Sequence, residues 1–90
     1  MLQSHRTIRF RKNVEVCIKR GYDMSLLKNV MRALATQQTL PKRCRPHKLR
    51  GEFTGCWECH IKGDWLLIYR YDFQKQQIFF EDTGTHSDLF

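Results

Sequence analysis

The chain has 90 residues, 41% of them hydrophobic and 12% aromatic, which predicts one small globular domain over residues 1–90 and argues against a disordered chain. Sixteen Lys and Arg against nine Asp and Glu give a net charge of +7, a balance that favours a polyanionic or acidic partner. The longest apolar run covers only residues 65–69, and the N-terminus is basic where a secretion signal would be apolar. We therefore expect no membrane segment, a cytoplasmic location and four reduced cysteines.

Two amphipathic helices are predicted after a short strand over residues 1–6. The first begins behind Thr7, which fits an N-cap, and ends at Gly21, which tolerates a left-handed conformation. Its apolar face recurs at helical spacing through Phe10, Val14, Cys17 and Ile18. The second helix begins behind Asp23 and closes before Pro41. Its apolar face is formed by Leu27, Val30, Met31 and Leu34.

The segment 38–51 follows no hydrophobic period and is predicted to be a loop. It carries the densest basic cluster of the chain, together with one histidine: Lys42, Arg43, Arg45, His47, Lys48 and Arg50.

Three strands are predicted in the second half of the chain. Residues 53–61 and 65–72 form a hairpin with Lys62 and Gly63 as its turn, and a third strand runs from about residue 76 to 83 before a short tail. In this register His60 opposes Trp65, so that His60 and Asp64 become near neighbours. The fold class is therefore α+β, with two N-terminal antiparallel helices packed on one face of a small antiparallel sheet.

Two cysteine patterns suggest alternatives to a plain globular core. Residues 56–60 read Cys-Trp-Glu-Cys-His, which matches the attachment motif of c-type haem, although no export signal accompanies it. Cys44, His47, Cys56 and Cys59 have spacings that could hold zinc. Against zinc, positions three apart in a strand point to opposite faces, so we expect thiols in or near the core and no metal.

The histidines suggest acid–base chemistry, because an imidazole exchanges protons near neutral pH. Cleavage of RNA without a metal needs a base for the 2′-hydroxyl, a cation beside the phosphorane and an acid for the leaving 5′-oxygen. His47, His60 and His86 are candidates, with Asp64 beside His60. Each histidine taken alone is also compatible with an ordinary surface or loop residue.

Three separated motifs together resemble the YafQ-type toxins of the RelE superfamily. They are His47-x-Leu49-x-Gly51, the stretch from Trp57 to Tyr69, and Thr83-Gly84-Thr85-His86-Ser87-Asp88-Leu89-Phe90. The N-terminal half matches more loosely, through residues 19–23 and 40–41. The resemblance implies the compact microbial-ribonuclease fold and a toxin that enters the empty ribosomal decoding site and cuts mRNA there, without metal or cofactor.

The resemblance also implies roles for individual residues and partners. His47, His60, Asp64 and His86 match the acid–base set. The family pattern does not fix which histidine is the acid and which the base; we expect His86 to be the proton donor and His60 with Asp64 to form the base side. Trp65 and Phe90 match aromatic positions near the substrate, or else a strand core and a tail anchor. The cations expected to contact RNA phosphates are Lys42, Arg43, Arg45, Lys48 and Arg50. A DinJ- or RelB-like antitoxin would cover the basic surface, and operator DNA would be bound only through that complex.

One position departs from the family pattern. The family has an arginine directly before the Thr-Gly-x-His segment, where this chain has Asp82. A negative charge facing the scissile phosphate would weaken catalysis, since one lost electrostatic contact typically costs about 3–4 kcal/mol. Three explanations are open: a nearby cation such as Arg70 or Lys48 substitutes for the missing arginine, the activity is attenuated, or the chain is an engineered inactive variant. The alternative functions are a non-catalytic RNA- or ribosome-binding module and a zinc-stabilised basic module.

Overall fold

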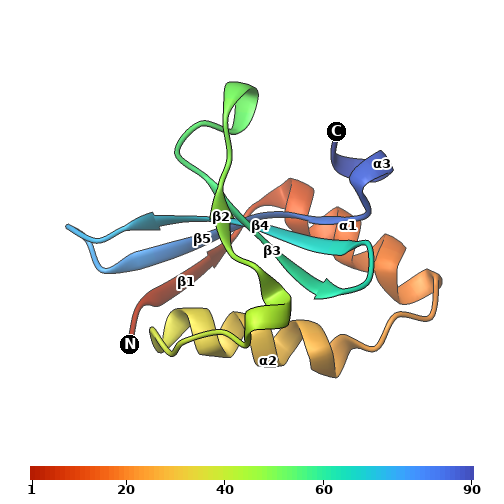
Figure 1. Ribbon diagram of the computed structural model, residues 1–90, viewed down its shortest axis with the longest axis horizontal. Helices are drawn as coiled ribbons and strands as arrows, with labels where there is room; N and C mark the ends of the chain where they lie inside the picture. Colours follow the sequence, from red (N-terminus) through yellow and green to blue (C-terminus); the bar gives the residue numbers. More distant parts are fainter.

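A computed structural model describes all 90 residues, and it places two helices on one side of a five-stranded mixed sheet (Figure 1). The helices are α1 (Ile8–Lys19) and α2 (Met24–Ala35), and a third, α3, spans His86–Leu89. The strands are β1 (Gln3–Arg6), β2 (His47–Lys48), β3 (Trp57–Lys62), β4 (Trp65–Asp72) and β5 (Gln77–Gly84), in the spatial order β1-β5-β4-β3-β2. Two 3₁₀ turns, η1 (Lys42–Cys44) and η2 (Gly51–Phe53), flank β2. The predicted α+β class is confirmed.

Both predicted helix starts are confirmed by their caps. The Thr7 hydroxyl accepts a hydrogen bond from the Phe10 amide at 3.0 Å and donates one to the Glu81 carbonyl at 2.7 Å, which ties the start of α1 to β5. Asp23 caps α2 by accepting from the Ser25 amide at 2.9 Å. The apolar face of α2 is buried as predicted, whereas Ile18 of α1 is 47% exposed and does not belong to the core.

The sheet is mixed rather than antiparallel, which corrects the sequence prediction. The predicted N-terminal strand exists as β1, but it lies parallel to β5, with Gln3 opposite Gln77 and Arg6 opposite Phe80. A strand that was not predicted, β2, lies inside the segment predicted to be a loop. Its two residues, His47 and Lys48, pair antiparallel with Glu58 and Trp57 of β3. A two-residue strand has no detectable period, so sequence pattern could not reveal it.

The β3–β4 hairpin has a different turn from the predicted one. Lys62 pairs with Trp65, so Gly63 and Asp64 form the two-residue turn, and an irregularity between His60 and Lys62 shifts the register. His60 consequently opposes Leu66 rather than Trp65. The turn has Gly63 at a φ of +54°, a value that glycine adopts without strain.

Side chains divide into two apolar groups on the two faces of the sheet. The larger core, sixteen buried residues, lies between the sheet and the helices and includes Phe10, Cys59, Trp65, Leu67 and Tyr69. The smaller group, on the face opposite α1 and α2, consists of Cys56, Leu66, Ile68 and Leu89 of α3. None of the helices has the length and apolarity needed to cross a membrane.

The C-terminal residues predicted to be a tail form the single turn of α3. Thr85 and Asp88 make a reciprocal capping box, in which each side chain accepts a hydrogen bond from the other's backbone amide. Leu89 anchors the turn in the smaller apolar group. Gly84 precedes the turn with a φ of +152°, and a Cβ there would lie 2.8 Å from the Asp88 carboxylate.

We expect Gly84→Ala to destabilise the protein by about 1–3 kcal/mol, because the backbone conformation disfavours a side chain and the new methyl would push Asp88 away. The melting temperature should fall by roughly 4–8 °C for each kcal/mol of stability lost. Amide hydrogen exchange in α3 should also become faster. Gly55→Ala is the matched control, since Gly55 has a φ of +92° but no atom within 4 Å of the added Cβ. Equal exchange rates in α3 for both variants would contradict the clash.

Candidate functional site

The candidate site lies on the sheet face that the helices leave open. Along β3, Cys59 and Ile61 belong to the larger core, so the alternating residues Glu58 and His60 point to the other face. His47 pairs with Glu58 and shares its side. The turn of α3 brings His86 to the same place, where the His60 and His86 rings lie 6.2 Å apart between centroids.

His86 is held by Asp64 of the β3–β4 turn. The Nδ1 atom of His86 hydrogen-bonds to the Asp64 carboxylate, and the His86 amide lies 3.4 Å from the same oxygen. Because the His86 side chain bonds to it, the pKa of the Asp64 carboxyl lies below its usual value. His60 also contributes to this lowering, as expected of the near neighbour predicted from the sequence, but the hydrogen bond of the Asp64 carboxylate goes to His86.

His60 is oriented by the backbone of the same turn. Its Nδ1 lies 3.1 Å from the Gly63 carbonyl oxygen, which can only accept a hydrogen bond. Nδ1 therefore carries a proton, and in the neutral ring Nε2 has the free lone pair. His60 is half-buried, and its ring faces the ring of His86.

His47 has acceptors at both ring nitrogens. Nδ1 lies 3.0 Å from the Arg45 carbonyl, and Nε2 lies 3.4 Å from the Glu58 carboxylate. The ring of His47 is thus oriented by the Arg45 carbonyl and lies beside the Glu58 carboxylate. The position of Glu58, 3% exposed, was missed at the sequence level. The sequence signal that could have revealed Glu58 is its place in a predicted strand, where a charged residue alternates with core residues.

Arg20, the C-cap residue of α1, fixes α3 from the other side. Its guanidinium donates two hydrogen bonds to the Asp88 carboxylate, at 2.6 and 2.9 Å. This bidentate contact holds the pKa of Asp88 well below its usual range. Since Asp88 also caps α3, the ion pair connects α1 to the turn that carries His86.

The two aromatic residues predicted to lie near the substrate have different environments. Phe90 is 59% exposed, with its ring 6.1 Å from His86 and edge-on to Phe53 at 5.4 Å, so it borders the site. Trp65 is 4% exposed in the larger core, and its indole N–H donates to the Thr83 hydroxyl at 2.9 Å. The structure thus places Trp65 in the strand core, where no base can stack on it.

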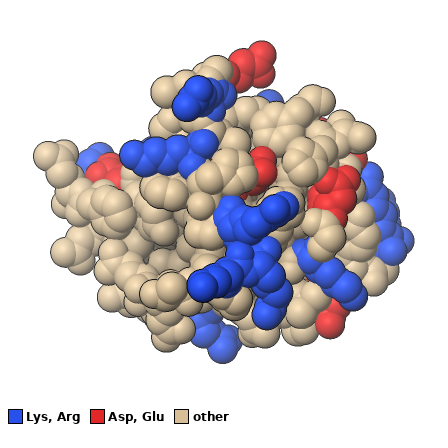
Figure 2. All heavy atoms as spheres, in the orientation of Figure 1, with Lys and Arg blue, Asp and Glu red and all other residues tan.

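The predicted RNA-binding cations are spread over the surface rather than gathered at the histidines. Figure 2 shows Lys and Arg across the middle of the molecule, over the region of η1 and β2. That region carries the exposed residues Lys42, Arg43, Arg45, Lys48 and Arg50. Lys48 pairs with Trp57, a neighbour of the larger core, so it lies on the opposite sheet face from His47. It therefore cannot replace a cation beside His86.

Asp82 is buried in a polar network on the same sheet face as the histidines, since it pairs with Ile68, which in turn pairs with Glu58. Its carboxylate accepts hydrogen bonds from Asn13 of α1 at 2.5 Å and from the Thr83 amide at 2.8 Å. Arg9 lies 4.0 Å away with its side chain 68% exposed. Arg70, the other proposed substitute, bonds to Glu81 at 3.0 Å. Both arginines line one cavity with Asp82, so two cations border this position.

The cysteines do not assemble with His47. Cys44 and Cys59 belong to the larger core, whereas Cys56 lies in the smaller group on the other face, as the strand alternation predicted. Burial raises the pKa of Cys59 to about 12, which keeps this thiol neutral. No group of three or more His, Cys, Asp or Glu side chains is arranged to hold a metal ion.

The site therefore combines three imidazoles. His60 has a lone pair on Nε2, His86 is anchored by the Asp64 carboxylate, and His47 lies beside the buried Glu58 carboxylate. The ring centroids of His60 and His86 lie 6.2 Å apart, which puts the two tilted rings next to each other, so a phosphodiester would lie across both ring edges rather than between their faces. Such an arrangement suits proton removal and proton donation on two sides of one phosphodiester.

Comparison with known proteins gives consistent results. A family model described as a bacterial toxin of type II toxin–antitoxin systems, YafQ, matches residues 2–90. The mRNA interferase toxin YafQ of Escherichia coli K12 is 37% identical over 82 residues, 90% of this chain and 87% of that protein. A metal-bound toxin from Helicobacter pylori superposes with a TM-score of 0.94 at 37% identity, covering 100% of both chains. YafQ in the E. coli DinJ–YafQ complex superposes with a TM-score of 0.87 at 33% sequence identity, covering 100% of this chain and 99% of that one.

The contact between His86 and Asp64 predicts a measurable shift. In His86→Ala, the pKa of Asp64 should rise toward about 3.9, its unperturbed value, because the bond that depresses it is gone. A depressed carboxyl pKa contributes to stability above the unperturbed value, and this contribution disappears as pH falls through the native pKa. Carboxyl ¹³C NMR titration measures both states. Asp88 is the internal control, since Arg20 and not His86 depresses its pKa; an unchanged Asp64 titration would contradict the proposed bond.

Proposed function

Because the chain belongs to the YafQ family of type II toxin–antitoxin toxins, we propose that it cuts mRNA on the ribosome by metal-free acid–base catalysis. The resemblance predicted from three motifs is confirmed by the family model and by the E. coli relative. The observation that supports the mechanism is the pair of adjacent histidines, His60 and His86, each with Nδ1 engaged and Nε2 free of protein contacts.

His60 acts as the base in this proposal. With Nδ1–H held by the Gly63 carbonyl, Nε2 accepts the proton of the ribose 2′-hydroxyl. The oxygen then attacks the adjacent phosphorus, and a pentavalent phosphorane forms.

His86 acts as the acid. The Asp64 carboxylate stabilises its protonated ring, much as a carboxylate orients the histidine of a catalytic triad. The proton on Nε2 passes to the leaving 5′-oxygen, and a 2′,3′-cyclic phosphate remains on the other fragment. Asp64 thus serves the acid, whereas the family-based expectation had placed it beside the base.

His47 contacts the phosphate in this proposal. The Arg45 carbonyl orients its ring, and half of the side chain is exposed to a ligand. The exposed cations of residues 42–50 attract ribosomal RNA and mRNA phosphates from a distance and fix the orientation of the toxin. Phe90 borders the site and offers an aromatic face to the codon.

Asp82 attenuates the activity without abolishing it. Its negative charge is offset by the hydrogen bond from Asn13 and by the nearby Arg9, so the field at the scissile phosphate is weaker than that of an exposed carboxylate. Arg9 is the better substitute for the family arginine, because Arg70 is already paired with Glu81.

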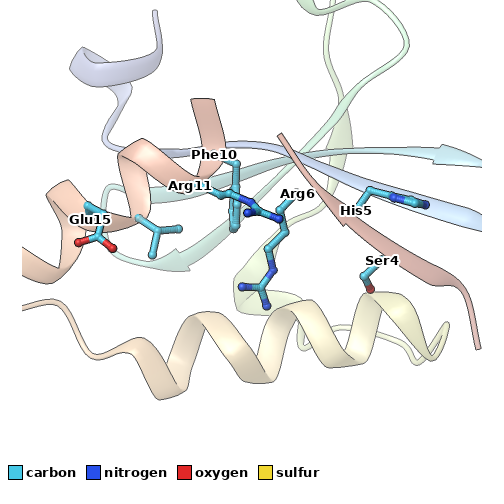
Figure 3. A pocket seen from close by; sticks show the side chains of 7 residues that line it. Ser4, His5, Arg6, Phe10, Arg11 and Glu15 are labelled. Atoms are coloured by element: carbon cyan, nitrogen blue, oxygen red, sulfur yellow. The ribbon is translucent and has the colours of Figure 1, made fainter. Parts of the chain in front are cut away.

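A cognate antitoxin would bind the groove shown in Figure 3. The homologous E. coli YafQ forms a complex with the antitoxin DinJ. In this chain, a cavity of about 630 Å³ lies beside β1 and α1, and Figure 3 shows Arg6 and Arg11 projecting into the space before α2. Neither arginine forms an ion pair within the chain, and Phe10 and Val14 line the apolar part. Unpaired arginines over an apolar floor fit an acidic amphipathic segment.

Cleavage of a defined mRNA on ribosomes with an empty decoding site tests the proposed catalysis. We expect slow cuts from the chain, a loss of at least about 10²-fold in His86→Ala, and faster cutting by Asp82→Arg. Asp82→Asn isolates the effect of charge, because it keeps a side chain of the same size. The cleavage rate of Asp82→Asn should lie between the rate of the unmodified chain and that of Asp82→Arg.

Three outcomes separate the candidate functions. Cuts that survive His86→Ala would refute the assigned acid. No cutting by the chain but cutting by Asp82→Arg would identify Asp82 as disabling. If neither the unmodified chain nor Asp82→Arg cuts the mRNA but both still bind ribosomes, the non-catalytic RNA-binding module is favoured.

The antitoxin groove is tested separately. Arg6→Glu combined with Arg11→Glu should weaken binding of the co-expressed antitoxin at least about 10-fold, as repulsion replaces attraction. Ribosome-dependent cleavage should persist, since neither residue lies on the histidine face. Lys75→Glu, in the β4–β5 turn, makes one charge reversal elsewhere and serves as the control. Undiminished antitoxin affinity in the double variant would reject this docking site.

A further inference from the structure

An aromatic groove lies on the sheet face opposite the histidines, and we propose that it binds single-stranded RNA by base stacking. The groove has a volume of about 550 Å³ and is lined by Lys48, Leu49, Thr54, Gly55, Trp57, Tyr71 and Phe73. The inference rests on the proposed function in one respect, since the ribosome is taken as the source of the RNA.

The groove lies where the helices no longer cover the sheet. Trp57 begins β3, and Tyr71 and Phe73 stand at the end of β4 and in the following turn. In Figure 1 this β4–β5 turn projects past the end of α2. Trp57 and Tyr71 pack against the margin of the larger core, which leaves each of them half-buried.

The aromatic rings are arranged as a preformed stack. Tyr71 and Phe73 lie parallel, with centroids 4.6 Å apart and an interplanar angle of 16°, and Tyr69 supports Tyr71 edge-on at 5.7 Å. The outermost ring, Phe73, is 61% exposed. A nucleobase can extend this stack with little loss of side-chain freedom, because the rings already support one another.

The charge of the groove favours a phosphate-bearing ligand. Lys48 is the only charged residue in its lining, and its ammonium lies 5.6 Å from the centre of the Trp57 ring. The acidic side chains nearby, Glu58 and Asp72, occupy alternate positions of their strands and therefore point to the other face. One cation beside exposed aromatic rings is the combination that sequence-tolerant binding of single strands uses.

The position of the groove separates it from the chemistry. His47 and Lys48 are adjacent in β2 and point to opposite faces, so RNA on the aromatic groove is not the strand held between His60 and His86. The groove consequently adds affinity for an unpaired stretch of ribosomal RNA and leaves proton transfer unaffected.

Quenching of Trp57 fluorescence by a single-stranded RNA oligonucleotide tests the binding. Trp65 is buried and provides a constant background. Phe73→Leu should weaken binding roughly 5- to 150-fold, the range for losing one base stack. Lys48→Gln should lower the slope of log affinity against log salt by about 0.7, as one phosphate contact is lost. The matched controls are Ile8→Ala, another exposed apolar residue, and Lys28→Gln on α2.

Two further measurements distinguish the groove from the proposed nuclease. Quenching should persist in His86→Ala, so a failed cleavage assay would not affect it. In the cleavage assay Phe73→Leu should raise the KM for ribosomes and leave kcat unchanged. Equal RNA affinity for Phe73→Leu and the parent chain would overturn the proposal. Loss of antitoxin binding in place of RNA binding would identify the groove as a protein-docking surface instead.

Discussion

The alternation of side chains along β3 and β4 is the constraint on which the rest of the structure depends. Cys59, Ile61, Leu67 and Tyr69 must face the helices to build the larger core, so Glu58 and His60 must face away. A shift of one residue would bury His60 and expose the core at once. The position of the histidine face is therefore enforced by burial of the opposite face, without any contact made by the histidines themselves.

The turn of α3 needs support from outside because four residues cannot form a stable helix in isolation. That support comes from Asp64 on the hairpin, Arg20 at the end of α1 and the Thr85–Asp88 capping box. Gly84 permits the close approach of Asp88. His86 is thus held by residues 22 and 66 positions away in the sequence, and its geometry depends on the whole fold.

Sequence reasoning recovered features with local signals and missed those set by pairing. Thr7, Asp23 and Gly21 bound the helices because caps and left-handed turns depend on residue type. The direction of β1 and the existence of β2 depend on distant partners and have no period of their own. The three histidines were recognised through their motif, which implied roles but no contacts. The predicted hairpin placed Asp64 near His60 but could not reveal its hydrogen bond to His86, because that contact depends on where α3 packs.

Charge is divided between the site and its surroundings in a way that separates attraction from chemistry. Within the site, His86 contacts Asp64 and His47 lies beside Glu58, so each of these two imidazoles has a carboxylate as its neighbour. The net charge of +7 is contributed elsewhere, by the 42–50 segment and by the arginines and lysines of α1. A long-range positive field attracts any polyanion, whereas the proposed proton transfer requires one phosphate held against two oriented rings. The proposed mechanism thus assigns binding of RNA and its cleavage to different residues of the same small domain.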